Sequence, residues 1–248
     1  MNILEVRGLT KSYGGVRAVQ DVSFHVAAGE LLAMIGPNGA GKTTCFNMVN
    51  GQLAPDSGDV QLEGRSLLGL ASRRIWRLGV GRTFQITATF GSMSVRENVQ
   101  MALLSHHRRT SSVFAASRNL YVREADALLE RVGMQSQTER VCSVLAYGDL
   151  KRVELAIALA NQPRLLLMDE PTAGMAPAER SQLMRLAADL ARSGGIAILF
   201  TEHDMDVVFG FADRVMVLAE GRIIAEGVPD AVRADAKVRE VYLGTLHA

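Results

Sequence analysis

The sequence predicts an α/β fold built around a mainly parallel β-sheet, and two observations lead to this prediction. Short apolar runs of strand length alternate with longer segments whose apolar residues recur at helical spacing, and this alternation favours a parallel sheet. A glycine-rich segment also joins one apolar run directly to a helical segment. With 248 residues, the chain is long enough for one large domain or for a core that holds an inserted subdomain.

The glycine-rich segment, GPNGAGKT at residues 36–43, fits the phosphate-binding pattern G-x-x-x-x-G-K-[ST]. Glycines let the backbone curl until its N–H groups face phosphate oxygens, Lys42 can place a positive charge on the β- and γ-phosphates, and Thr43 offers a hydroxyl to Mg²⁺. The apolar run at 31–35 predicts a buried strand, and residues 43–51 predict a helix, so the phosphates would lie at a helix N-terminus that favours anions. The candidate nucleotide-binding residues are Gly36, Pro37, Asn38, Gly39, Ala40, Gly41, Lys42, Thr43 and Thr44.

The first third of the chain reads as strands and turns. Residues 2–7 and 20–26 predict two strands with a turn at 11–15 between them, as in an antiparallel subdomain, and residues 53–64 contain a further strand. From residue 92 to residue 155 the pattern becomes helical.

The last third returns to alternating strands and helices. An amphipathic helix over 181–194 lies between buried strands at 164–170 and 196–203, and residues 214–227 predict two strands joined at Glu220-Gly221. We therefore expect a single domain. Residues 1–91 and 156–248 form its nucleotide-binding core, and residues 92–155 form an inserted helical subdomain.

Composition narrows the class of protein. Lys plus Arg is 27 and Asp plus Glu is 26, and this balance gives no reason to propose a nucleic-acid partner. No apolar run approaches the roughly 18–20 residues that span a bilayer, and the first residues lack the apolar stretch of a signal peptide, so we expect a soluble, cytoplasmic protein. Cys45 and Cys142 show neither metal-type spacing nor a disulfide pattern.

A second motif, LLLMDEPT at residues 165–172, supplies the carboxylates that hydrolysis would need. The apolar strand ends in Asp169, which places a carboxylate at the edge of the sheet where α/β proteins bind ligands and where it could hold a metal ion. Glu170 follows and could activate the attacking water as a general base, a contribution of typically 10²–10⁴-fold.

Several motifs now occur in one order: Tyr13, the loop at 36–43, Gln85, LAYGD at 145–149, LLLMDE at 165–170 and His203. In this order the chain resembles the ATP-binding subunits of ABC transporters, over almost its whole length. The resemblance implies an ABC ATPase core with the P-loop NTPase fold, and ATP and Mg²⁺ as ligands. It implies that Tyr13 stacks on adenine, that Gln85 contacts Mg²⁺ and water, and that His203 contacts the γ-phosphate and orients Glu170.

The segment LAYGD stands where the family has LSGGQ, before a predicted helix. In the family this signature closes over ATP held by the opposite subunit, so the resemblance implies a dimer. The candidate residues acting in trans are Ala146, Tyr147, Gly148 and Asp149. Ala146 lacks the serine hydroxyl of the family, and AGMA at 173–176 departs from the usual SALD, so we expect weaker or asymmetric contacts.

Three features resemble one group of the family, the importers of branched-chain and related amino acids: LAYGD in place of LSGGQ, the long helical insertion at 92–140, and the segment 201–227. The ending VREVYLG at 238–244 is similar too. This implies a second ABC ATPase chain, in a hetero- or homodimer, with membrane permease subunits that contact residues 86–105, and indirectly a substrate-binding protein. The ATPase would lie peripherally on the inner face of the cell membrane. Two alternatives stay open: the ATPase of a lipid or lipopolysaccharide exporter, and a soluble non-transport ABC ATPase. A P-loop kinase or GTPase would not explain Gln85, LAYGD and His203 together.

Overall fold

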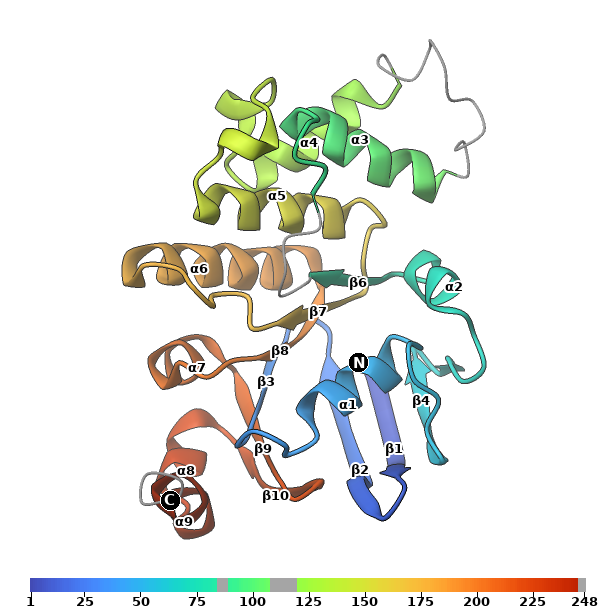
Figure 1. The fold of residues 1–248 in the computed structure, drawn as a ribbon, viewed down its shortest axis with the longest axis vertical. Coiled ribbons are helices and arrows are strands. Elements are labelled where there is room, and N and C mark those ends of the chain that lie inside the picture. Colours follow the sequence, from blue (N-terminus) through green and yellow to red (C-terminus); the bar gives the residue numbers. More distant parts are fainter. Residues whose placement is uncertain (84–88, 108–119, 245–248) are drawn as a thin grey trace.

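The computed structural model of this chain describes residues 1–83, 89–107 and 120–244, with side chains up to Val241 (Figure 1). A six-stranded sheet has the strand order β10-β9-β3-β8-β7-β6 and is parallel except for the antiparallel pair of β9 and β10. The mainly parallel sheet predicted from the sequence is therefore confirmed. Its strands are β3 (Leu31–Ile35), β6 (Val80–Thr83), β7 (Leu165–Asp169), β8 (Ala197–Thr201), β9 (Arg214–Ala219) and β10 (Arg222–Gly227).

A second sheet, antiparallel with the order β2-β1-β4-β5, confirms the N-terminal β subdomain. Its strands are β1 (Asn2–Tyr13), β2 (Val16–Ala27), β4 (Ser57–Leu62) and β5 (Arg65–Ser66). The turn predicted at 11–15 was too long, because Tyr13 pairs with Val16 and only two glycines form the bend. Gly14, at φ +57°, supplies the left-handed conformation that a two-residue hairpin turn needs.

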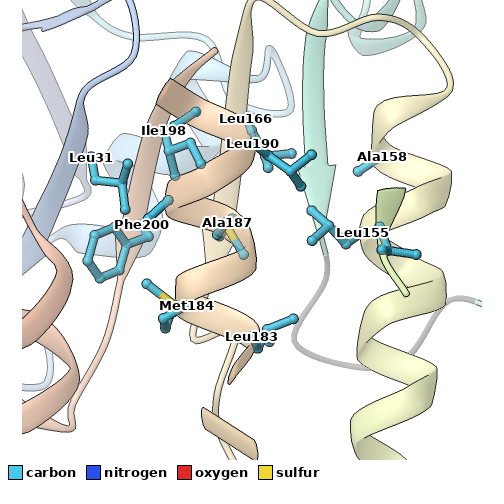
Figure 2. Close-up of a cluster of buried hydrophobic side chains, with 14 of the residues drawn as sticks. Leu31, Leu155, Ala158, Leu166, Leu183, Met184, Ala187, Leu190, Ile198 and Phe200 are labelled. Atoms are coloured by element: carbon cyan, nitrogen blue, oxygen red, sulfur yellow. The ribbon is translucent and has the colours of Figure 1, made fainter. Parts of the chain in front are cut away.

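The strands of the parallel sheet are buried on both faces. In β3, Leu32 and Met34 pack with Phe46 of helix α1 (Lys42–Val49), whereas Leu31 and Ile35 belong to the cluster on the opposite face. Figure 2 shows that opposite cluster between the sheet and α6 (Pro177–Gly194), with Leu31, Ile198 and Phe200 from the strands against Met184 and Ala187 from the helix. Burial on both faces explains why these strands read as continuous apolar runs.

The helical middle of the chain lies above α6 and β6 in the view of Figure 1, and its helix α5 contacts both of these elements. It comprises α3 (Val95–His106), α4 (Val122–Arg131), α5 (Tyr147–Leu159) and two short 3₁₀ turns, Gln135–Gln137 and Cys142–Val144. The boundaries of the inserted helical subdomain, placed after residue 91 and after residue 155, stay a prediction. Residue 155 lies inside α5.

Other short elements are absent from the sequence prediction because they lack a clear apolar period. They are α2 (Ser72–Arg77), strand β6, α7 (Met205–Phe211), α8 (Pro229–Ala234) and α9 (Ala236–Gly244). No helix in the described part of the chain combines the length and the apolar character needed to cross a membrane.

Candidate functional site

The phosphate-binding pattern forms a loop between β3 and α1, and its backbone requires glycine at both ends. Gly36 has φ +152° and Gly41 has φ +103°. A Cβ atom on Gly36 would lie 2.1 Å from the carbonyl oxygen of Leu218, and one on Gly41 would lie 2.4 Å from that of Ala18. The pattern read from the sequence is thus needed for packing against β9 and β2 as well as for exposing N–H groups.

Lys42 places its ammonium group inside this loop. Its Nζ donates to the carbonyl oxygens of Gly36 at 2.6 Å and of Pro37 at 3.1 Å, and the residue is only 8% exposed. Burial lowers the pKa of Lys42, while the carboxylates of Glu170 and Asp169 act in the opposite direction. A phosphate bound in the loop would add negative charge next to this cation and would stabilise its charged form.

A cavity of about 320 Å³ opens over the loop. Glu170 and His203 form part of its wall, and β2 contributes one residue. The complete lining is Ala18, Asn38, Gly39, Ala40, Gly41, Lys42, Thr43, Thr44, Glu170 and His203. The structure therefore brings most of the predicted phosphate-binding residues, including Lys42, to one cavity together with Glu170 and His203.

Asp169 lies at the end of β7 and accepts two side-chain hydrogen bonds. Its Oδ1 accepts from the Thr201 hydroxyl at 2.8 Å, and its Oδ2 lies 3.4 Å from Nη2 of Arg82. Arg82 also donates to Asn47 at 3.1 Å and to Gln52 at 3.0 Å, and so connects β6 to α1 and the turn that follows it. Burial lowers the pKa of Arg82, and Asp169 opposes that shift.

Arg82 and Thr201 were missed by the sequence analysis. Asp169 and Thr201 are register partners in β7 and β8, and Thr83 pairs with the residue before Asp169. Knowing which strands are neighbours would have identified Arg82 and Thr201 as partners of Asp169, but strand pairing cannot be read from this sequence.

Glu170 and His203 form a direct pair at the wall of the cavity. Oε1 of Glu170 lies 2.8 Å from Nε2 of His203, and the Glu170 side chain is 23% exposed. The backbone of Glu170 has φ +47°, and its N–H group donates to both the carbonyl and the hydroxyl of Thr201 at 3.1 Å. Non-glycine residues in this conformation concentrate at functional sites. A carboxylate held beside an imidazole at an anion-binding loop can accept a proton from water.

The other predicted residues lie elsewhere. Tyr13 ends β1 and is 51% exposed, and Ala146 precedes α5 as its extended N-cap. Asp149, in the first turn of α5, accepts a hydrogen bond from Gln137 at 2.9 Å. Neither Tyr13 nor the start of α5 is among the described residues that line the cavity. Gln85 lies outside the residues that the structure describes.

The family model for ABC transporters matches residues 19–173, from β2 through the loop, the helical middle and the Asp169-Glu170 pair. The chain belongs to the ABC transporter family. As an ABC ATPase it binds ATP and hydrolyses it to power transport. A second model, for the branched-chain amino acid ATP-binding cassette transporter, matches residues 222–248 of this ABC ATPase.

Relatives and solved structures agree with the family assignment. The high-affinity branched-chain amino acid transport ATP-binding protein LivG of Escherichia coli (strain K12) is 39% identical over 250 residues, which cover 98% of each chain. The lipopolysaccharide export system ATP-binding protein LptB of Acidithiobacillus ferridurans is 36% identical over 98% of this ABC ATPase and 97% of LptB. The crystal structure of an ABC transporter cassette in its ADP conformation superposes with a TM-score of 0.88 at 31% identity, covering 98% of this chain and 99% of that one.

Proposed function

We propose that this ABC ATPase powers the import of branched-chain or related amino acids. The observation that supports the cargo class is the match of residues 222–248 to the branched-chain amino acid transporter model, in addition to the similarity to LivG over the whole chain. The LptB relative is nearly as similar, so identity alone does not separate importer from exporter, whereas the C-terminal match favours the importer.

We propose that the phosphates of ATP occupy the cavity over the loop. Lys42 neutralises charge on the β- and γ-phosphates, and the N–H groups at the start of α1 bind their oxygens. Glu170 accepts a proton from the attacking water, and His203 keeps the Glu170 carboxylate facing the γ-phosphate. The 2.8 Å contact of Glu170 with His203 supports this division of roles. Catalysis of phosphoryl transfer then rests on positioning and charge neutralisation.

The donor set near Lys42 fits Mg²⁺. Thr43 offers a hydroxyl and Asp169 a carboxylate, and hard cations prefer such oxygens. The hydrogen bond from Thr201 and the nearby Arg82 keep the Asp169 carboxylate in one orientation at the strand end. Thr43 and Asp169 would hold the ion, and Gln85 is proposed as a third ligand. When bound, Mg²⁺ neutralises charge on the β- and γ-phosphate oxygens.

We propose that a second ABC ATPase chain completes the site. The start of α5 does not line this chain's own cavity, so residues 146–149 would bind the nucleotide of the partner, and Tyr13 would stack on the adenine of its own nucleotide. Closure would use backbone N–H groups at the start of α5, since Ala146 has no hydroxyl to donate. A heterodimer would suit this departure, because the partner could contribute a complete signature.

The membrane partners are also part of the proposal. Permease subunits would dock on residues 86–105, of which the described part includes the exposed Phe90 and the capped start of α3. A substrate-binding protein would deliver the amino acid to the permease on the other side of the membrane. The ATPase would then lie on the inner face of the cell membrane, held there by the permease.

The solution mass of Glu170→Gln with and without Mg-ATP tests the site and the dimer together. The variant should bind ATP without hydrolysing it, so a competent dimer accumulates; Lys42→Ala, which should not bind ATP, is the control. An ATP-dependent homodimer would favour the exporter alternative, whereas an ATP-bound monomer would indicate a missing partner ATPase. Hydrolysis by Glu170→Gln at the wild-type rate would contradict the role of Glu170.

The cargo is tested by uptake of labelled leucine into cells that contain the cognate permeases and binding protein. Uptake should require the wild-type ATPase and fail with Lys42→Ala. Equal leucine uptake with the wild type and with Lys42→Ala would contradict the proposal that this ATPase powers amino-acid import.

A further inference from the structure

Glu202 is a buried carboxylate to which the proposed mechanism gives no part. It lies between Thr201 at the end of β8 and His203, and it is 4% exposed. A buried carboxylate is costly unless hydrogen bonds satisfy it. Its partners therefore indicate what it holds in place.

Three donors converge on the Glu202 carboxylate. Oε1 accepts from the backbone N–H of Thr172 at 2.8 Å and from the Thr172 hydroxyl at 2.6 Å, while Oε2 accepts from the backbone N–H of His203 at 3.2 Å. Thr172 is itself only 1% exposed and lies two residues after Glu170. One side chain thus connects the segment that follows Glu170 with the segment that contains His203.

The Glu170–His203 pair needs such support because it borders open space. It lines the cavity over the phosphate loop. It also lines a second cavity of about 340 Å³, whose wall includes Thr172 and Glu202. The His203 side chain is 50% exposed, so packing restricts its ring little.

A second attachment follows directly after His203. Asp204 caps the start of α7 and pairs with Arg180, near the start of α6. This ion pair is more open to solvent, with side chains 32% and 27% exposed, so it holds the segment less firmly than the buried carboxylate does.

We propose that Glu202 is a positioning residue, which through Thr172 holds the His203 imidazole against the Glu170 carboxylate. The inference rests on the roles proposed above for Glu170 and His203. Charge-assisted hydrogen bonds are roughly twice as strong as neutral ones, so an ionised Glu202 suits this task better than an amide. A misplacement of about 1 Å at a reacting group can cost on the order of 10²-fold in rate.

Glu202→Gln tests the proposal with little change in shape. The amide oxygen can still accept from Thr172, but the NH₂ group would face the N–H of His203, and two donors cannot bond. We expect kcat for ATP hydrolysis to fall at least tenfold, with KM for ATP within about twofold of wild type. Thr172→Val, which lacks the hydroxyl, should show a smaller fall in kcat, and Thr172→Ser should restore the wild-type value.

The matched control is Glu30→Gln. The Glu30 side chain is 16% exposed, accepts a hydrogen bond from the N–H of Ala27 at 2.6 Å and pairs with Arg214 at 3.0 Å. It lies next to the start of β3, at the opposite end of that strand from the phosphate loop. Glu30→Gln should change thermal stability but leave kcat unchanged.

A second measurement needs no turnover. In ¹H–¹⁵N spectra of the histidine side chains, His203→Ala identifies the signal of the His203 ring. Glu202→Gln should shift or broaden that signal, and Glu30→Gln should not.

The outcomes separate the two proposals. A wild-type kcat in His203→Ala would overturn the role of His203 itself. A reduced kcat in His203→Ala together with a wild-type kcat in Glu202→Gln would overturn only the present inference about Glu202. An unchanged signal of the His203 ring in Glu202→Gln would overturn the present inference independently of any kinetic measurement. Equal losses of kcat in Glu202→Gln and Glu30→Gln would show that Glu202 only stabilises the fold.

Discussion

Two glycines of the phosphate loop should respond very differently to the same substitution. Gly36 and Gly39 lie three residues apart, both at positive φ, +152° and +80°. A Cβ on Gly36 would lie 2.1 Å from the Leu218 carbonyl oxygen, 3.1 Å from that carbonyl carbon and 3.1 Å from the Ala40 side chain. A Cβ on Gly39 would have no atom within 4 Å. Gly36→Ala therefore adds a collision to backbone strain, and Gly39→Ala adds strain alone.

The magnitude follows from these contacts. Strain at a left-handed residue costs about 1 kcal/mol for Gly39→Ala, and a domain of this size loses roughly 2–4 °C in Tm per kcal/mol. For Gly36→Ala, widening the contact with Leu218 to at least 3.0 Å requires a shift of nearly 1 Å between the loop and β9. Strain and overpacking each cost roughly 1–3 kcal/mol, so we expect about 3 kcal/mol or more, or roughly 6–12 °C.

Thermal melting followed by circular dichroism, on nucleotide-free wild type and both variants, measures the difference. Gly36→Ala should melt well below Gly39→Ala. ATP affinity of Gly36→Ala should fall at least tenfold, because the shift moves the loop's N–H groups. Equal Tm values for the two variants would refute the argument from the Leu218 contact.

Three further predictions concern other parts of the chain. Burial raises the pKa of Cys45 to about 12, so its alkylation at pH 8, followed by peptide mass spectrometry, should be on the order of 10³-fold slower than for a free cysteine; rapid labelling of the folded protein would contradict its burial. Burial disfavours ionisation of Asp204, but the N–H of Val207 and the Arg180 guanidinium outweigh it and hold the pKa of Asp204 below its usual 3.8. Asp204 contributes its full stability above the pKa of the unfolded state, and this contribution is lost as pH falls through the lower pKa of the folded state. Asp204→Asn should therefore lose less Tm than the wild type does below about pH 4. The same dependence of Tm on pH in both proteins would contradict this prediction. Ala146→Ser should raise ATP hydrolysis if the signature is merely weakened, and an unchanged rate in the assembled dimer would show that the hydroxyl is unused.

The site could be predicted from the sequence where its chemistry is local. The loop, the strand before it and the helix after it are contiguous, and each residue type has a geometric reason to be there. Asp169 and Glu170 likewise come at the end of a short apolar run whose length is typical of a buried strand. The family resemblance and the position of His203 after a buried strand predicted a place beside the phosphate loop, and His203 lines the cavity over that loop.

Much of the fold could be predicted from the sequence for the same reason, and the elements that were predicted wrongly or missed are short. Continuous apolar runs gave β3, β7 and β8, whereas β6, with the short sequence VGRT, has no period to read. The turn of the first hairpin was overestimated because Lys11 and Ser12 read as loop residues but pair with β2.

The order of amino acids specifies which chemical groups are present and which of them lie at strand ends. Which strand ends become neighbours depends on how the strands assemble into the sheet. The sheet order sets β7 between β6 and β8, so Asp169 meets Arg82 and Thr201, and Thr172 meets Glu202. These contacts join residues about 30 to 90 positions apart, and no local pattern encodes them, because strand order depends on packing the whole sheet between two hydrophobic layers.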